Sequence, residues 1–300
     1  MRARRRPILW GLVGTVLMLA TFFLLALVLT MLLTGEAGIA DGAMKIALVP
    51  LEGVISSDLA EHTVRQLRKY AEDPSIKAIV MRIDSPGGGV AASQEIYEEV
   101  KRLRADGKLV VASFGSLAAS GGYYVACAAD RIFTNPGTIT GSIGVIVQLA
   151  NAEELLRKMG IESTAITSGP FKDSGSPARP LRPEDRAVFQ TLVDDVYQQF
   201  VDAVAQGRHL EPAEVRQYAD GRVYTGRQAK AFKLVDDLGT LQDAIAYAAS
   251  TIGVAGKPKL VQERRERLWW LKFVLESIRT YATFQPFSAG DSVLQYRWPY

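Results

Sequence analysis

A serine flanked by alanine and glycine lies where the sequence pattern of a strand changes to that of a helix. Ser120 lies within F-G-S-L-A-A-S-G-G-Y-Y (residues 114–124), between a strand expected over 108–113 and a small-residue helix expected over 117–129. Near the start of a helix, free backbone N–H groups and the positive end of the helix dipole favour negative charge. Small neighbours also let an extended peptide approach closely. The pattern therefore fits a nucleophilic serine, although tight packing of a helix on a sheet would explain it equally well.

A glycine loop could assist such a serine. The sequence D-S-P-G-G-G at residues 84–89 follows a buried-type strand expected over 77–83 and precedes a helix expected over 92–104. The loop matches neither the G-x-G-x-x-G dinucleotide fingerprint nor the Walker pattern with its lysine. Beside a serine at a strand-to-helix turn, its N–H groups could instead hold a developing oxyanion. An ordinary tight turn is the alternative.

The serine would also need a base. The two histidines, His62 and His209, adjoin no loop at the end of an expected strand, which argues against a serine–histidine–aspartate triad. Lys172 lies in a turn-rich loop over 168–177, immediately after a strand expected over 163–167. A serine–lysine pair is a recognised variant of the triad, and burial lowers the pKa of a lysine so that it can accept a proton. Taken alone, this lysine would more simply be a solvated surface charge.

The composition excludes several other classes of protein. The chain carries 35 Lys+Arg against 32 Asp+Glu, and four of the arginines fall within the first six residues, so the remainder is nearly neutral and indicates no nucleic-acid partner. Cys127 is the only cysteine, which excludes an internal disulfide and a cysteine metal cluster. We expect a plain buried thiol there. The sequence contains no motif for a metal or a cofactor.

Residues 8–34 form a run of 27 residues without a charge, rich in leucine, valine, phenylalanine and methionine. About 20 apolar residues span a bilayer, whereas the apolar region of a cleavable signal has only about 7–15. We therefore expect a transmembrane helix over 8–34. The basic residues 1–7 should stay in the cytoplasm by the positive-inside rule, which places the rest of the chain on the other side of the membrane.

Beyond a linker over 35–43, strands alternate with helices, which indicates an α/β fold with largely parallel strands. One or two strands are expected within 44–55 and a helix over 58–70. The later expected elements are strands over 131–134 and 144–147, a helix over 153–159 and a long helix over 183–205. We assign this domain to 44–255. The C-terminal extension, 256–300, has an apolar stripe around Leu268–Ile278 that predicts an amphipathic helix for a membrane surface, a neighbouring subunit or the core.

Five segments, in this order, resemble those of the serine–lysine signal peptide peptidases, a family often called protease IV. They are D-S-P-G-G-G (84–89), S-L-A-A-S-G-G-Y-Y (116–124), T-G-S-I-G-V (140–145), S-G-P-F-K-D (168–173) and G-R-V-Y-T-G-R-Q-A (221–229). The similarity covers about 45–250, and no catalytic position departs from the family's pattern. The chain is most similar to the short form, which has one copy of the fold and an N-terminal anchor.

The resemblance implies roles for particular residues. It implies Ser120 as the nucleophile, Lys172 as the general base and Ser142 as the hydroxyl that hydrogen-bonds the lysine. The implied donors of the oxyanion hole are the backbone N–H groups of Gly88 (or Gly87) and Gly121. The chemistry of such a pair involves no metal and no cofactor.

The implied fold is the ββα superhelical core of the Clp protease and crotonase relatives, assembled into ring- or dome-shaped homo-oligomers. The implied activity is endopeptidase cleavage of remnant signal peptides and other short apolar peptides, on the extracytoplasmic side of the inner cell membrane. The loop around Lys172 is rich in glycine, serine and proline, so we expect it to be mobile and wet until a neighbouring subunit orders it. Ser120 and Lys172 of one site could then come from different subunits.

Three other functions stay open. A non-catalytic assembly factor would keep the fold and the oligomer, but it would be free to lose Ser120, Lys172 and the glycine loop. A crotonase-type acyl-CoA enzyme would share the fold and the oxyanion hole, but a membrane anchor would hold it away from cytoplasmic CoA. A quality-control protease acting on misfolded membrane proteins would use the same catalytic residues.

Overall fold

The computed structural model describes residues 14–15, 17–26, 44–263 and 295–297. The chain divides into two compact units, residues 1–43 and 44–300. In the first unit, helical residues lie within 14–26, and their apolar side chains, such as Leu17 and Phe22, are exposed. Among the described residues, no helix is both long and apolar enough to cross a membrane. Most of the transmembrane helix expected over 8–34, and the linker over 35–43, lie outside the described residues.

The second unit is organised around a mixed sheet that has eight strands in the described part of the chain. Its main path runs β7 (Val223–Thr225), β6 (Ile139–Gly141), β4 (Leu109–Ala119), β2 (Ile76–Ser85), β1 (Lys45–Glu52) and β9 (Lys259–Val261). The remaining two are β5 (Arg131–Thr134), which pairs with β4, and β8 (Asp237–Leu238), which pairs with β5. All pairings are parallel except that of β6 with β7. The prediction of an α/β fold with largely parallel strands is confirmed.

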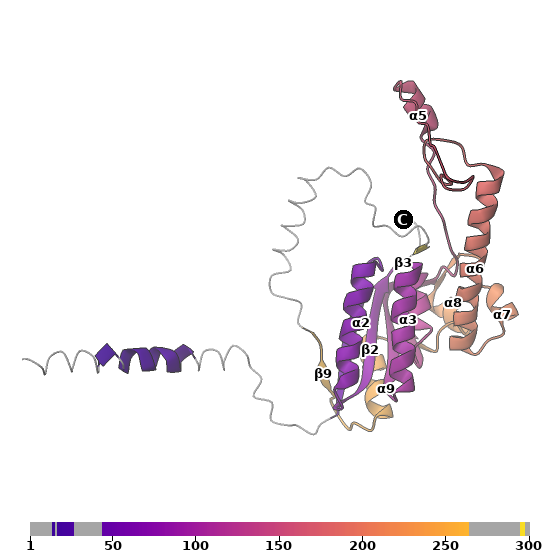
Figure 1. Ribbon diagram of the computed structural model, residues 1–300. Coiled ribbons are helices and arrows are strands. Elements are labelled where there is room, and N and C mark those ends of the chain that lie inside the picture. Colours follow the sequence, from indigo (N-terminus) through magenta and orange to yellow (C-terminus); the bar gives the residue numbers. More distant parts are fainter. Residues whose placement is uncertain (1–13, 16, 27–43, 264–294, 298–300) are drawn as a thin grey trace, which may run out of the picture. The chain divides into compact units, whose positions relative to one another are not determined.

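Helices cover both faces of this sheet (Figure 1). One face carries α2 (Ser57–Glu72), α3 (Val90–Ala105), α4 (Gly121–Ala126) and the C-terminal half of α6 (Pro183–Arg208). The other face carries α9 (Leu241–Thr251). The remaining described helices of this unit are α5 (Glu153–Lys158), α7 (Pro212–Arg216) and α8 (Gly226–Ala231).

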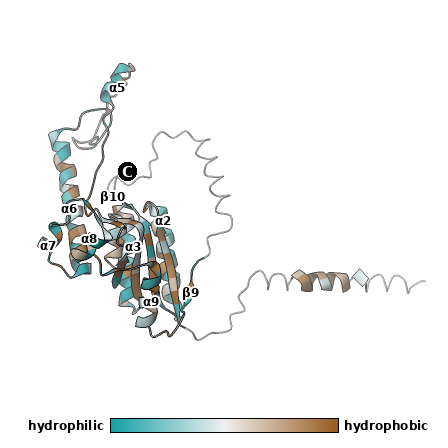
Figure 2. Cartoon of the chain, turned by 180° about the vertical axis from the view of Figure 1, so that it is seen from behind, coloured by the Kyte–Doolittle hydropathy of each residue, from teal (hydrophilic) through white to brown (hydrophobic). Residues whose placement is uncertain are grey.

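Two apolar clusters fill the two sides of the sheet. In β1, Val49 and Leu51 belong to the cluster that also holds α2 and α3 residues, whereas Ile46 belongs to the cluster with α9. Successive side chains of a strand point to opposite faces, so a strand covered on both sides is apolar at nearly every position. Figure 2 shows strands coloured mostly as hydrophobic and helices that carry both hydrophilic and hydrophobic residues.

Three expected elements differ from the structure. β4 continues to Ala119 because residues 117–119 pair with β6, so the following helix begins at Gly121 and not at residue 117. No strand forms over 163–167, and 144–147 has only a bridge residue at 146. Alternating sequence becomes a strand only where another strand edge lies beside it. Residues 163–167 lack that partner in the structure, and Ile166 is 99% exposed.

Residues 144–182 connect β6 to the start of α6 and form no strand of the main sheet, and we call them the excursion. Several of its apolar side chains are exposed, namely Leu155, Met159, Ile161, Ile166 and Phe171. Apart from Asp185, the buried residues of α6 begin at Val196, so the first half of this helix extends beyond the core (Figure 1). Of the C-terminal extension, only 256–263 and 295–297 are described, and the expected amphipathic helix lies outside them.

A small separate sheet joins β3 (Gly87–Gly89) to β10 (Gln295–Arg297). β3 comes directly after β2 and directly before α3, so it lies at the carboxyl end of the parallel strands. Ligands of open α/β sheets bind at this end.

Candidate active site

Ser120 occupies the turn between β4 and α4. Its φ of 53° and ψ of −118° are unusual for a residue other than glycine. The N–H of Ser120 donates to the carbonyl of Gly141 (2.8 Å), and its carbonyl accepts from the N–H of Tyr124 (2.8 Å), which together hold the turn. The hydroxyl makes no capping bond to α4, and the residue is 1% exposed. Strained backbone of this kind is frequent at functional sites, and here it leaves the hydroxyl unused by the helix.

The N–H groups of the glycines in β3 point to different edges of the strand. Ile55 pairs with one edge of β3, because its N–H donates to the carbonyl of Gly87 (2.9 Å) and its carbonyl accepts from Gly89 (2.9 Å). Successive amides of a strand point to opposite edges, so the N–H of Gly88 faces away from Ile55. The N–H of Gly87 donates to Ser85 Oγ (3.1 Å). Gly87 and Gly88 are the two loop glycines expected from the sequence as possible oxyanion donors. Of these, Gly88 has the N–H that points to the edge of β3 away from Ile55.

Gly121, the first residue of α4, lies against this glycine strand. A Cβ on Gly121 would come within 3.2 Å of the nitrogen of Gly88 and 2.5 Å of Ser93 Oγ. A Cβ on Gly88 would come within 2.2 Å of the carbonyl oxygen of Ile55. Only glycine fits at either position without displacing a neighbour. The first N–H groups of a helix have no partner inside it, so the N–H of Gly121 is not used within α4, and Gly121 lies close to the backbone nitrogen of Gly88.

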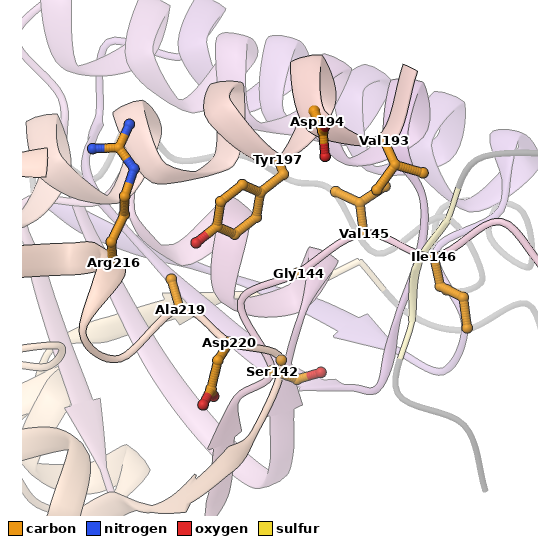
Figure 3. Close-up of a pocket in the computed structure, with 11 residues that line it drawn as sticks. Ser142, Gly144, Val145, Ile146, Val193, Asp194, Tyr197, Arg216, Ala219 and Asp220 are labelled. Atoms are coloured by element: carbon orange, nitrogen blue, oxygen red, sulfur yellow. The ribbon is translucent and has the colours of Figure 1, made fainter. Parts of the chain in front are cut away.

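Ser142 lies next to Ser120 because of the register of β4 and β6. Ala119 is paired with Gly141 in parallel, so the residues that follow them, Ser120 and Ser142, are neighbours across the sheet. Ser142 also has a left-handed backbone (φ 49°), and its N–H donates to the carbonyl of Arg222 (2.8 Å). It borders a cavity of about 510 Å³ between α6 and the segment before β7 (Figure 3). The cavity is also lined by Val145, Ile146, Val193, Tyr197 and Arg216.

Lys172 is not brought to Ser120 within one chain. Its side chain is exposed, and its ammonium group has no hydrogen bond or ion pair to any described residue. Its loop is hydrogen-bonded to Asp185 in the first turn of α6. Asp185 precedes Phe200 by about 22 Å of helix at 1.5 Å per residue. The ring of Phe200 lies 5.1 Å from that of Tyr124, one turn after the serine.

Residues 168–177 around Lys172 are exposed or half-buried, and the loop is tied to α6 by ion pairs that the sequence did not predict. Asp173 is bound by Arg179 (2.7 and 2.8 Å) and not by the adjacent lysine. Arg179 and Arg182 are not among the candidate residues predicted from the sequence, which contains no motif for this cluster.

Other candidate residues take structural roles. His62 is exposed on α2 and His209 is exposed at the end of α6, so neither adjoins Ser120. Cys127 is 1% exposed, and burial raises the pKa of its thiol to about 12, which confirms the plain buried thiol. Ser85, which supports the glycine loop through Gly53 (2.6 Å) and Gly87, was not recognised from sequence, although it stands within D-S-P-G-G-G. Among the described residues, no group of three or more His, Cys, Asp or Glu side chains could hold a metal ion.

An extended segment of the same chain lies along the edge of β3 that faces away from Ile55. β10 pairs with β3 in antiparallel fashion, with Gln295 opposite Gly89, Tyr296 opposite Gly88 and Arg297 opposite Gly87. The strand also contacts α3 and α4, the helices that begin beside the glycine strand and Ser120. The edge next to Ser120 can therefore pair with an extended backbone.

Comparison with known proteins gives two matching family profiles. The profile described as peptidase family S49 matches residues 102–255, and that described as Clp protease matches residues 37–138. Between them they include Ser120, the glycine strand and Lys172.

Named relatives agree with these profiles. A Synechocystis protein named as a protease is 48% identical over 210 residues, covering 70% of this chain and 75% of the relative. An Enterococcus faecium protein named as a signal peptide peptidase is 38% identical over 185 residues, covering 62% of this chain and 54% of the relative. Protease 4 of Salmonella typhi is 41% identical over 187 residues, covering 62% of this chain but only 30% of that longer protein.

Proposed function

Since this chain belongs to peptidase family S49 and is a serine peptidase, we propose that Ser120 is its nucleophile and Lys172 its general base. The substrates proposed are remnant signal peptides and other short apolar peptides, bound in extended form. A relative named as a signal peptide peptidase supports this substrate class. The Clp protease profile over 37–138 supports the same type of fold around the nucleophile.

The proposed reaction assigns one role to each of these groups. Ser120 Oγ attacks the peptide carbonyl while its proton passes to the neutral amine of Lys172. The N–H groups of Gly88 and Gly121 stabilise the resulting oxyanion. Lys172 then protonates the departing amine, and later takes a proton from the water that attacks the acyl group and returns it to Ser120 Oγ as the serine departs. The hydroxyl of Ser142, beside Ser120, would orient the amine.

The pairing of β10 with β3 is the observation that supports peptide binding most directly. A peptide added to a sheet edge gains affinity from backbone hydrogen bonds, which do not depend on sequence. With the peptide on the edge of β3, a carbonyl opposite Gly88 would lie beside the N–H that faces away from Ile55. Acyl transfer requires that arrangement of carbonyl and donor.

We further propose that the lysine is supplied by a neighbouring subunit. Lys172 is exposed and lies far along α6 from the serine of its own chain, and the excursion carries exposed apolar side chains such as Ile166 and Phe171. Exposed apolar surface of this kind marks contact sites. A neighbour that covers it could bring Lys172 to a second Ser120 and remove water from the amine, which favours the neutral form of a lysine.

The proposed setting is the inner cell membrane. The uncharged run over 8–34 supports a single transmembrane anchor, with residues 1–7 in the cytoplasm and the peptidase domain outside it. A homo-oligomer in the form of a ring or dome would hold its sites close to the membrane, where remnant signal peptides remain.

The test is cleavage of a fluorogenic leucine-rich peptide by the purified full chain. Ser120→Ala and Lys172→Ala should each abolish turnover, because one removes the attacking oxygen and the other the proton acceptor. Ser116→Ala and Lys158→Ala are matched controls, since both side chains are exposed and lie on the same segments. The controls should keep wild-type rates.

Other outcomes would point to the other functions. A folded wild-type oligomer that cleaves no peptide would identify an assembly factor. Activity retained by Lys172→Ala would remove the lysine from the mechanism. If destabilised membrane proteins were cleaved at least as well as free signal peptides, the enzyme would act in quality control.

A further inference from the structure

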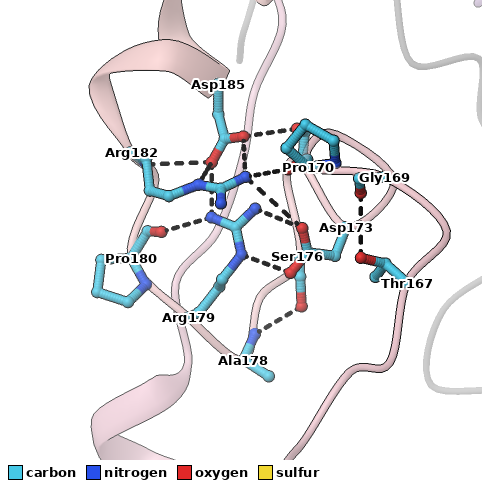
Figure 4. Close-up of polar contacts among 11 residues, drawn as sticks. Thr167, Gly169, Pro170, Asp173, Ser176, Ala178, Arg179, Pro180, Arg182 and Asp185 are labelled. Carbon is cyan, nitrogen blue, oxygen red and sulfur yellow. Dashed lines mark hydrogen bonds and ion pairs between the residues drawn. The ribbon is translucent and has the colours of Figure 1, made fainter.

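Five side chains at the start of α6 form a charged cluster, which we call the brace: Asp173, Ser174, Arg179, Arg182 and Asp185 (Figure 4). Asp185 lies at its centre. One carboxylate oxygen accepts from Ser174 Oγ (2.6 Å) and Arg182 Nη2 (2.8 Å). The other accepts from Arg179 Nη1 (2.6 Å) and Arg182 Nε (3.0 Å). Both oxygens are therefore fully used by partners from the loop and from the residues before α6.

The brace holds the backbone on both sides of Lys172. Before the lysine, the guanidinium of Arg182 donates to the carbonyl of Pro170. After it, Asp173 receives two parallel hydrogen bonds from Arg179, and Ser174 donates to Asp185. Lys172 itself takes no part and is exposed. The loop is thus fixed at the residues that flank the lysine, while the amine points to the surroundings.

Ion pairs, and not apolar packing, hold the loop around Lys172 in place. Around the loop, the apolar side chains of Phe171 and Ile166 are 48% and 99% exposed, so they contribute little packing. Asp185 is the exception to this exposure, because it is fully buried. The hydrogen bonds from Arg182 and Arg179 hold the pKa of its carboxyl well below the usual range, so it stays charged near neutral pH. Bidentate arginine–carboxylate pairs add geometric precision as well as attraction.

We propose that Asp185 and Arg179 are positioning residues for the general base, which fix the loop on both sides of Lys172 so that its amine meets a Ser120 in one orientation. This inference rests on the proposed serine–lysine function. Proton transfer requires hydrogen-bond distance between base and hydroxyl, and a misplacement of about 1 Å can cost about 100-fold in rate. A lysine on an unsupported loop rich in glycine and proline would not meet that tolerance.

Two variants remove the brace by different routes. Asp185→Asn keeps the shape of the side chain, but its NH2 group would face arginine or serine donors where an oxygen stood. Arg179→Gln removes the bidentate contact with Asp173 and the bond to Asp185. Each should lower kcat by about 10- to 100-fold and leave KM within about twofold, because the peptide binds on β3 and not on the loop. Glu184→Gln is the matched control, since Glu184 is exposed in the same helical turn and the change in charge is the same as for Asp185→Asn.

A double-mutant cycle separates positioning from general stability. A fluorophosphonate probe labels Ser120 without requiring turnover, so its rate can be measured with and without Lys172. If the brace acts through the lysine, Asp185→Asn slows labelling in the wild-type background and has no further effect in Lys172→Ala. If it acts by holding the fold, both backgrounds lose the same factor. Light scattering establishes whether each variant keeps its assembly.

The results distinguish positioning of Lys172 from general support of the fold. A loss of kcat in the brace variants supports the inference if the slowing of probe labelling vanishes in the Lys172→Ala background and assembly is intact. Unchanged kcat, an equal slowing of labelling in both backgrounds, or loss of assembly in both brace variants would overturn it. If Lys172→Ala alone keeps wild-type activity, the base assignment of the proposed function fails, and this is distinguishable because it does not involve the brace variants.

Discussion

Mixing two inactive variants tests whether one active site is made by two subunits. Ser120→Ala retains Lys172, and Lys172→Ala retains Ser120, so neither homo-oligomer contains a complete pair if both residues are required. Within one chain the lysine loop is attached to Asp185, about 22 Å of helix away from Phe200 and the serine turn beside it. Lys172 is exposed and makes no hydrogen bond to Ser120 of its own chain. A shared site therefore predicts that activity returns on mixing.

The expected recovery of peptidase activity follows from how subunits of the two variants combine at random in the assembly. In a random equal mixture, four combinations of serine donor and lysine donor are equally frequent, and one of them is intact. The mixture should reach about a quarter of wild-type activity per site if each interface of a cyclic assembly forms one site. The recovered activity should be greatest at equal amounts of the two variants and smaller at other ratios, since an excess of one variant leaves fewer complete pairs.

The assay is hydrolysis of a fluorogenic peptide after incubation under conditions of subunit exchange. Exchange is followed independently with two fluorophores, one on each variant. A mixture of Ser120→Ala with Ser116→Ala-Ser120→Ala is the negative control, because it exchanges subunits but contains no intact serine. If exchange is complete and peptide hydrolysis stays at the level of that control, the pair lies within one chain and the reasoning from the placement of Lys172 is refuted.

Further predictions concern the glycine strand and the core. Removing residues 295–300 should raise kcat/KM for peptides severalfold, because β10 occupies the edge of β3; an unchanged rate would show that the tail does not compete. Gly121→Ala should lower kcat by about 100- to 1000-fold, and Ser93→Ala should restore part of it, since the new Cβ would lie 2.5 Å from Ser93 Oγ. Tyr123→Phe should reduce the free energy of unfolding in urea by about 1–2 kcal/mol, because the buried hydroxyl donates to a backbone carbonyl at 2.7 Å. Cys127, whose pKa is raised to about 12 by burial, should resist thiol reagents at pH 8 until the protein unfolds, and labelling of the native protein would contradict its burial.

The sequence alone determined the alternation of strands and helices in the domain and the places where its glycines interrupt them. Strands buried on both faces, such as β1 and β2, are recognisable because apolar residues at consecutive positions satisfy both sides of the sheet. The order of the five segments was enough to indicate the family, which the profiles then showed. The positions of Ser120 and Gly121 were readable because few residue types fit a strand-to-helix turn that closely approaches another backbone.

Only the tertiary structure determined which of the candidate site residues lie close together. The distinction between Gly87 and Gly88 depends on Ser85 and Ile55, which take up the N–H of one glycine and fix the direction of the other. Residues 163–167 have the composition of a strand, yet they form none, because strand formation depends on a neighbouring edge that local sequence does not encode. The separation of Lys172 from the serine follows from the length and direction of α6. Distances between segments far apart in the chain are set by how the elements pack, and no spacing along the sequence specifies them.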